Sequence, residues 1–363
     1  MKIPFVNLTA QRTAYREELQ AAAERVYASG CFIGGIEVER LEEELSAYVG
    51  VPYTVSCASG TDALTLALMA LELRPGDEVI VPDFSFIAPA ECVRFLGGTP
   101  RFADISPGSF LIDPLSVKEL INPKTKGIIA VNLFGECAPY EELRRIASQN
   151  QLWLLEDAAQ SFGAAQNGKR SGSLADIAIT SFYPTKPLGC YGDGGALFTR
   201  NQEIAARVRK LANHGSTSRY LHECTGINSR LDSLQAAVLR VKLSHLNQEL
   251  KLRQSNAEKY DSFFSNFQEI QIPVPAAGNQ SSFAQYTLRS SARERWLSHL
   301  KRAEIPCCIH YPSPLHRQPC FADLKPETQN TPHTKKACEE VFSLPICAFT
   351  DTDLIIQFVN ASL

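Results

Sequence analysis

Two segments of the chain carry residue types suited to binding a phosphate and a cationic ring. Ser59, Gly60 and Thr61 follow an apolar run and precede a helical pattern, so the free N–H groups of a helix start could bind a phosphate there. Asp157 ends another apolar run, where its carboxylate could keep a ring nitrogen protonated. In both segments an ordinary helix cap is the alternative.

A third segment, TSFYPTKPLGCYGDGGALFT from Thr180 to Thr199, carries a lysine in an unusual setting. Lys186 stands between Pro184 and Pro187 in apolar, glycine-rich sequence, so it is not on a solvated helix face. Desolvation would lower the pKa of its amine and favour imine formation, whereas a surface turn is the alternative. The glycines lack the GxGxxG spacing of a dinucleotide site, which disfavours a nicotinamide dehydrogenase.

Together the segments supply a phosphate turn, an acid and a lysine, in that order, with Ser181 just before the lysine. A phosphate cradle, a partner for a pyridinium nitrogen and an imine-forming lysine are what pyridoxal phosphate requires of a protein. The conjunction predicts a pyridoxal phosphate site more strongly than any single member does.

The elements that must position these residues follow from hydrophobic periodicity. From Pro52 to Thr199, short runs rich in Val, Ile and Leu alternate with amphipathic stretches, which predicts a mostly parallel α/β sheet with helices on both faces. The predicted strands are Tyr53 to Cys57, Glu78 to Pro82, Thr99 to Asp104, Gly127 to Val131, Leu152 to Glu156, Ile177 to Phe182 and Ala196 to Thr199.

Beyond Asn201 the pattern changes to long helices and then to a smaller α/β tail. Helices are expected at Gln202 to Asn213 and at Leu231 to Phe264, and the length of the second suggests a connector between domains. The tail is predicted as strand, helix and strand at Phe283 to Ser290, Ala292 to Ala303 and Pro306 to Tyr311. We therefore predict a large domain over residues 1–245 and a small C-terminal domain over residues 246–363.

Composition excludes several other classes of function. The 36 Lys and Arg residues balance 39 Asp and Glu residues in a chain of 363, so no basic field indicates a nucleic-acid partner. No apolar run fits a signal peptide or a membrane span. The eleven cysteines are odd in number and lack zinc spacing, so we expect reduced, mostly buried thiols, no metal site and a cytoplasmic protein.

The chain also resembles the DegT/DnrJ/StrS family of nucleotide-sugar aminotransferases over nearly its full length. The matching segments are FVNLTAQ at Phe5 to Gln11, CASGTDAL at Cys57 to Leu64, PGDEVIVPDFSFIA at Pro75 to Ala88, EDAAQSFGA at Glu156 to Ala164, SFYPTKPLGCYGDGGALFT at Ser181 to Thr199 and NSRLDSLQAA at Asn228 to Ala237. The resemblance implies the fold type I of pyridoxal phosphate enzymes, with a seven-stranded sheet in a large domain resembling that of aspartate aminotransferase.

The resemblance also implies roles for individual residues. Lys186 would form the imine with the cofactor and move the proton, and Asp157 would pair with the ring nitrogen. The remaining cofactor contacts implied are Gln160 near the phenolic oxygen, Phe86 on the ring face, Gly60, Thr61 and Ser181 at the phosphate, and Asn228 reaching the phosphate of a neighbouring subunit in a homodimer.

On the substrate side, the chain is most similar to a subgroup that aminates the 3-oxo position of a UDP-linked 2-acetamido-hexuronic acid with L-glutamate. The segments that carry this similarity are HG...RYLH at His214 to His222, AQYTLR at Ala284 to Arg289 and HYPSPLHRQP at His310 to Pro319. Arg230 could bind a carboxylate, with a structural ion pair at the dimer interface as the alternative. His310 and Tyr311 match a sugar-contacting segment, with strand packing as the alternative.

Several alternatives stay open at this stage. Gly35, Ile36 and Cys224 depart from the family's pattern near the expected sugar site, so a 3- or 4-keto-6-deoxy sugar on dTDP, UDP or GDP competes with the uronic acid. Glutamine competes with glutamate as the donor. A sugar dehydratase of this fold typically has histidine in place of Lys186, and a non-catalytic regulatory protein is a further alternative.

Overall fold

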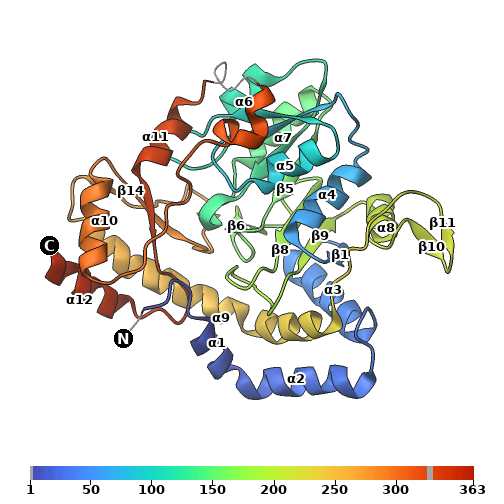
Figure 1. Ribbon diagram of the computed structural model, residues 1–363, viewed down its shortest axis with the longest axis horizontal. Coiled ribbons are helices and arrows are strands. Elements are labelled where there is room, and N and C mark those ends of the chain that lie inside the picture. Colours follow the sequence, from blue (N-terminus) through green and yellow to red (C-terminus); the bar gives the residue numbers. More distant parts are fainter. Residues whose placement is uncertain (1–2, 325–329) are drawn as a thin grey trace.

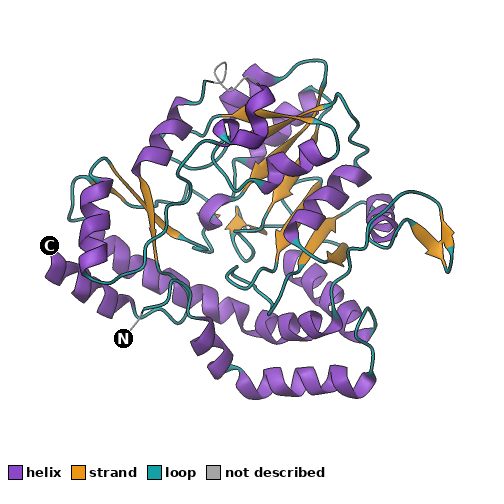
Figure 2. Cartoon of the chain, viewed as in Figure 1, coloured by secondary structure: helices purple, strands orange, loops and turns teal. Residues whose placement is uncertain are grey.

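The computed structural model describes residues 3–324 and 330–363. Its centre is a seven-stranded sheet in which β9 alone runs antiparallel to the other strands (Figures 1 and 2). In spatial order the strands are β1 (Tyr53–Cys57), β9 (Gly195–Thr199), β8 (Ile177–Ser181), β5 (Trp153–Asp157), β4 (Thr125–Val131), β2 (Glu78–Pro82) and β3 (Thr99–Ala103). All seven predicted strands are confirmed, and each predicted end lies within two residues of the observed one.

The sheet is covered by helices on both faces, because successive side chains of a strand point to opposite sides. In β2, Val79 and Val81 pack into one core and Ile80 into another. The helices of the first face are α4 (Gly60–Ala70), α5 (Ala88–Phe95) and α8 (Gln202–Leu211). Those of the second face are α3 (Ile36–Val49), α6 (Pro114–Leu120), α7 (Tyr140–Gln149) and the first part of α9 (Ser233–Phe264).

Helix α9 connects the two ends of the molecule. Its 32 residues span about 48 Å at 1.5 Å per residue, and Figure 1 shows it running along the lower part of the molecule above α2 (Arg16–Ser29) and beside α1 (Leu8–Ala14). The predicted domain boundary at residue 245 falls inside this unbroken helix. The division into residues 1–245 and 246–363 therefore stays a prediction.

The C-terminal part has its own core between the end of α9 and a three-stranded antiparallel sheet. The elements of this part are β12 (Ile270–Gln271), β14 (Tyr286–Ser290), α10 (Arg293–Arg302), β15 (Val341–Leu344) and α12 (Thr352–Ser362). The strand predicted at Pro306 to Tyr311 was wrong. Of this range only Cys308 forms a bridge, to Ser343 in β15. Pro306, two residues earlier, lacks the N–H group that a continuing ladder would need on that side.

Shorter elements complete the described chain. A hairpin of β10 (Ser216–Ser218) and β11 (Leu221–His222) projects from the body at the right of Figure 1. The others are η1 (Leu133–Gly135), β6 (Ala165–Gln166), β7 (Lys169–Arg170), β13 (Asn279–Gln280), η2 (Leu315–Arg317), η3 (Pro319–Leu324) and α11 (Pro332–Glu340). Within residues 3–324 and 330–363, no helix is both long and apolar enough to cross a membrane. All eleven cysteines carry free thiols.

Candidate active site

Polar side chains gather where the parallel strands of the large sheet end. Each of five strands ends at or is followed directly by one: Asp83 after β2, Asp104 after β3, Asn132 after β4, Asp157 in β5 and Ser181 in β8. Ligands of parallel sheets bind at this edge because the strand ends and the starts of the following helices meet there. Three of the positions, Asp83, Asp104 and Asn132, were not singled out from the sequence.

The start of α4 lies directly against the end of β8. A Cβ atom added to Gly60 would lie 2.6 Å from the Ser181 Cβ atom, so only glycine allows this approach. Ser59 also caps the helix, since its side chain accepts a hydrogen bond of 3.0 Å from the Asp62 N–H. The turn is thus a helix cap that leaves an 11-residue helix with its first N–H groups beside the Ser181 hydroxyl, which suits a phosphate.

Asp157 and Lys186 influence each other across this edge of the sheet. Asp157 is buried, and burial raises the pKa of its carboxyl to about 6, although a 2.9 Å hydrogen bond from the Ala159 N–H and the charge of Lys186 act to lower it. Burial lowers the pKa of the Lys186 amine, against the opposing effect of Asp157. A low amine pKa increases the fraction of unprotonated, nucleophilic nitrogen near neutral pH.

The C-terminal part contributes two neighbours to this site. The Gln160 amide donates a 3.2 Å hydrogen bond to the Tyr311 hydroxyl and accepts one of 3.0 Å from the Phe134 N–H. Burial raises the pKa of Tyr311 to about 12, and Asp157 acts in the same direction. Burial lowers the pKa of His310, as does the charge of Lys186, and its ring pairs with the Ser343 hydroxyl at 3.0 Å.

Thr61 and Phe86, two of the residues implied for the cofactor, are exposed in this chain. Thr61 is exposed in the first turn of α4, and Phe86 presents 54% of its surface to solvent just before α5. An aromatic side chain with that exposure is free to stack against a planar ring.

Asn228 and Arg230 lie together on an exposed segment next to the phosphate turn. The Arg230 guanidinium donates two hydrogen bonds, of 2.8 and 3.1 Å, to the Asn228 side-chain oxygen. Ser229 between them is buried and donates a 2.6 Å hydrogen bond to Asp62 of α4. Among the described residues of this one chain, no carboxylate oxygen lies within 4.0 Å of the Arg230 guanidinium. An ion pair across a dimer interface stays the alternative for this residue.

Sequence reasoning missed the residues that attach the C-terminal part to this edge. The Asp83 carboxylate pairs with the His316 ring at 2.6 Å and accepts a 2.7 Å hydrogen bond from the Thr331 hydroxyl. Asp104 accepts hydrogen bonds from the His333 and Thr334 N–H groups at the start of α11. Asp83 and Asp104 each stand directly after an apolar strand, as Asp157 does in the predicted strand pattern. That position was the signal that could have identified them.

The comparison with protein families decides what this arrangement is. The model of the DegT/DnrJ/EryC1/StrS aminotransferase family matches residues 13–361. The chain belongs to this family. It is therefore a sugar aminotransferase, and its cofactor is pyridoxal phosphate.

Individual relatives are similar over almost the whole chain. The UDP-2-acetamido-2-deoxy-3-oxo-D-glucuronate aminotransferase of Pseudomonas aeruginosa is 45% identical over 361 residues, which cover 99% of each chain. The dTDP-3-amino-3,4,6-trideoxy-alpha-D-glucose transaminase of Streptomyces venezuelae is 39% identical, covering 99% of this chain and 95% of the relative. The crystal structure of S. venezuelae DesV with a ketimine intermediate has a TM-score of 0.96 at 38% identity, covering 99% of this chain and 97% of that one.

The residues of this DegT-family chain fit pyridoxal phosphate. Gly60 allows the start of α4 to lie against Ser181, so that a phosphate could meet both the helix N–H groups and the Ser181 hydroxyl. Asp157 supplies a buried acid with a raised pKa. A cationic ring nitrogen beside that acid would offset the burial that raises its pKa. The side chains that a pyridinium phosphate needs are thus gathered at one edge of the sheet.

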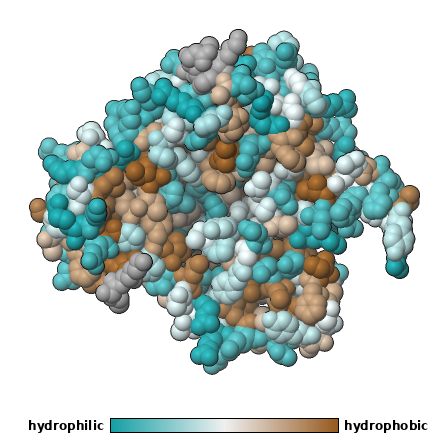
Figure 3. Space-filling model, viewed as in Figure 1, coloured by the Kyte–Doolittle hydropathy of each residue, from teal (hydrophilic) through white to brown (hydrophobic). Residues whose placement is uncertain are grey.

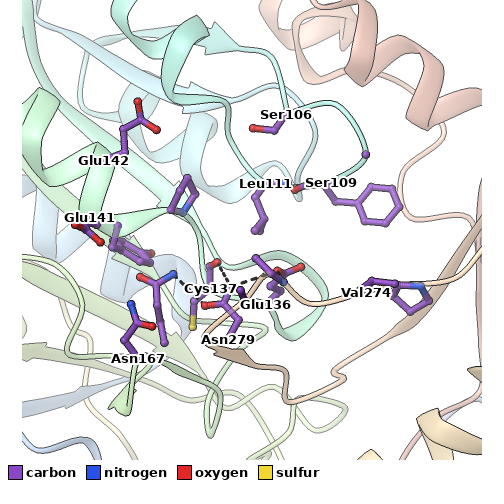
Figure 4. Close-up of a pocket in the computed structure, with 18 of the residues that line it drawn as sticks. Ser106, Ser109, Leu111, Glu136, Cys137, Glu141, Glu142, Asn167, Val274 and Asn279 are labelled. Carbon is purple, nitrogen blue, oxygen red and sulfur yellow. Dashed lines mark hydrogen bonds between the residues drawn. The ribbon is translucent and has the colours of Figure 1, made fainter.

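A separate cavity of about 630 Å³ lies beside the C-terminal part (Figure 4). Its carboxylates are Glu136, Glu141 and Glu142, and Arg145 is its guanidinium. Glu136 accepts hydrogen bonds from the Ala276 N–H at 2.7 Å and the Asn279 amide at 3.2 Å. An excess of acids disfavours a phosphate, so this cavity does not compete with the start of α4 as the cofactor site.

Proposed function

We propose that this enzyme transfers the amino group of L-glutamate to the 3-oxo position of a UDP-linked 2-acetamido-2-deoxy-hexuronic acid, for polysaccharide or lipopolysaccharide sugar synthesis. The observation that carries the proposal is the 45% identity, over 99% of both chains, to the P. aeruginosa enzyme named for that keto sugar. The site supports it with Arg230, whose exposed guanidinium bonds to the neutral Asn228 amide and could turn to a substrate carboxylate.

The chain's own residues divide the work of holding the cofactor. Bound pyridoxal phosphate supplies an electrophilic carbonyl carbon and a ring that withdraws electrons from the substrate carbon. Asp157 holds a proton at the ring nitrogen because its carboxylate and the cation favour each other's charge. The other proposed contacts are Gly60, Thr61 and Ser181 for the phosphate, Phe86 for the ring face and Gln160 for the phenolic oxygen.

Lys186 is the proposed catalytic residue. Its lowered pKa favours the unprotonated amine, so Nζ would be the nucleophile that holds the cofactor through its carbonyl carbon, with the carbonyl oxygen leaving as water. The same nitrogen would accept and return the substrate's proton. Besides burial, the charge of Lys186 lowers the pKa of His310, and that of Asp157 raises the pKa of Tyr311, so both rings lie near these groups. This nearness supports a role for His310 and Tyr311 in contacting the sugar.

A second copy of the chain completes the proposed site. Asn228 lies on the surface, where it could reach the phosphate held by a partner. Large hydrophobic side chains are exposed around α2 and α3, at Tyr27, Phe32, Ile33 and Ile36, as a homodimer interface would require. Figure 3 shows hydrophobic patches interrupting the hydrophilic surface of the viewed face. The free thiols support the expected cytoplasmic location.

The first experiment is a coupled assay for 2-oxoglutarate. Holoenzyme receives L-glutamate and UDP-2-acetamido-2-deoxy-3-oxo-glucuronic acid generated in situ, beside the variants Lys186→Ala and Lys169→Ala. The wild type and Lys169→Ala, which changes an exposed lysine of β7, are expected to turn over, and Lys186→Ala is expected to be inactive.

Two other outcomes would change the proposal. Release of 2-oxoglutarate from glutamate without turnover of the uronic acid would favour a 3- or 4-keto-6-deoxy sugar, a substrate class supported by the 39% identity to the S. venezuelae transaminase. Turnover with glutamine in place of glutamate would correct the donor. Wild-type activity in Lys186→Ala would overturn the role of the lysine.

A further inference from the structure

The loop that carries Lys186 is compact and closed by its own backbone. The Phe182 N–H donates to the Gly194 carbonyl at 2.7 Å, and the Cys190 N–H donates to the Phe182 carbonyl at 2.8 Å. At Gly189 an added Cβ atom would lie 2.4 Å from the Pro184 carbonyl oxygen, so the chain turns tightly just after Lys186. The carbonyl of Gly189 faces outward from this turn, toward α9.

Helix α9 binds this loop at two points. The Lys242 ammonium donates a 2.6 Å hydrogen bond to the Gly189 carbonyl and lies 4.3 Å from the centre of the Tyr191 ring. Gln235 accepts a 2.8 Å hydrogen bond from the Tyr191 N–H. Gln235 and Lys242 are seven residues apart, about two helical turns, so both project from one face of α9.

The environment of Lys242 makes this contact costly to maintain. Only 2% of the residue is exposed, and no carboxylate oxygen lies within 4.0 Å of its ammonium in the part of the chain with described positions. Burial lowers the pKa of Lys242 to about 8, although Glu249 on the same helix and Cys190 on the loop favour its charge. An apolar side chain at this position would avoid the cost of burying an ammonium. The role of the ammonium is therefore expected in its two partners on the loop, the Gly189 carbonyl and the Tyr191 ring.

We propose that Lys242, together with Gln235, is a positioning residue that fixes the loop carrying Lys186 in the geometry required for amino transfer. The ammonium acts through the Gly189 carbonyl and the Tyr191 ring and touches neither cofactor nor substrate. The inference rests on the proposed role of Lys186. It assigns to α9, the helix that also extends into the C-terminal part, control over where that amine points.

The test compares hydrogen exchange and kinetics in matched variants. In the full chain without added cofactor, Lys242→Met is expected to speed amide exchange of residues 183–194 by about tenfold, because a charge-assisted hydrogen bond is lost. In the holoenzyme the same change is expected to lower kcat about tenfold or more at nearly unchanged KM for L-glutamate, since misplacing a reacting group by about 1 Å can cost about 100-fold. Lys242→Arg should restore part of both properties.

Lys251→Met is the control, because Lys251 is an exposed lysine of the same helix. It should leave both exchange and kcat as in the wild type. Folded Lys242→Met with wild-type exchange in residues 183–194 and wild-type kcat would overturn the proposal.

If Lys242→Met does not fold, Gln235→Ala provides the same test from the partly exposed end of the contact. Faster exchange of residues 183–194 in that variant would support the proposal, and wild-type exchange would overturn it. The exchange readout needs no turnover, so it separates failure of this proposal from failure of the proposed reaction.

Discussion

Aspartate residues at the carboxyl ends of the sheet strands have two different environments, one after β2 and β3 and the other in β5. Under β2 and β3, the carboxylates of Asp83 and Asp104 are each engaged by three groups from backbone and side chains. In β5, Asp157 accepts one hydrogen bond from the residues with described positions, that of the Ala159 N–H, and its pKa is raised. Asp83 and Asp104 therefore attach the C-terminal part to the sheet, whereas Asp157 is left able to pair with a cationic ligand.

The difference shows that position after a strand does not by itself mark a functional acid. Asp83, Asp104 and Asp157 all stand at carboxyl ends of parallel strands. A carboxylate whose oxygens are already engaged by protein donors is stabilised as an anchor, whereas one that is buried with few donors gains by pairing with a ligand's charge. Counting donors separates the two groups.

The largest expected effect is the loss of stability when Asp83, which attaches the C-terminal part, is replaced. Asp83→Ala leaves the His316 ring, the His316 N–H and the Thr331 hydroxyl without their buried acceptor, so the free energy of unfolding should fall by about 3 to 5 kcal/mol. Urea unfolding would measure this loss. Asp323→Ala removes an exposed ion pair with Arg94 and should cost less than about 1 kcal/mol. Equal losses of unfolding free energy in the two variants would show that Asp83 is not an anchor of the C-terminal part.

The stability of the cofactor-free protein should depend on pH through the buried carboxyl of Asp157. The pKa of Asp157 is about 6 in the folded protein and near 3.9 in an unfolded chain. The folded state therefore holds its proton over a pH range in which the unfolded state has lost it. This carboxyl lowers the stability of the cofactor-free protein as pH rises from about 4 to 6, and the full cost remains above pH 6.

Asp157→Asn removes that cost. Without cofactor it should be more stable than the wild type by about 2 to 3 kcal/mol at pH 8 and nearly equal to it at pH 4, while its amino-transfer activity falls. Unfolding in urea at both pH values checks the sign, with Asp323→Asn as a surface control. A stability difference that does not change with pH would count against the raised pKa.

The smallest expected effect is on cofactor affinity, when Phe86, proposed to stack on the pyridine ring, is replaced. Phe86→Leu should weaken binding of pyridoxal phosphate by about tenfold or less, because aromatic pairs contribute about 0.5 to 1.5 kcal/mol beyond buried area. Phe95→Leu changes another exposed phenylalanine, at the end of α5, and should leave the affinity unchanged. Titration of cofactor-free protein followed by absorbance measures both. Equal affinities in wild type and Phe86→Leu would remove Phe86 from the site.

Local patterns predicted the strands of the large sheet and several residues of the candidate site. All seven strands were found because alternation and apolar runs are properties of neighbouring residues. In the C-terminal part the same method failed, since Pro306 to Tyr311 forms only one bridge, to Ser343, and the strand β15 at Val341–Leu344 was not predicted. Which segment pairs with β14 depends on competition between distant segments, and no local period encodes the outcome.

The sequence by itself determined the strands of the sheet, the Ser59 cap and the position of Lys186 between two prolines, because each depends on residues close together in the chain. The burial that lowers the pKa of Lys186 comes from tertiary packing. Only the tertiary structure decided which acids are anchors and that Lys242 binds the loop of Lys186. Asp83 and His316 are 233 positions apart, and Gly189 and Lys242 are 53 apart. Contacts over such separations form when whole elements pack, and that packing also sets the burial that shifts the pKa of Asp157.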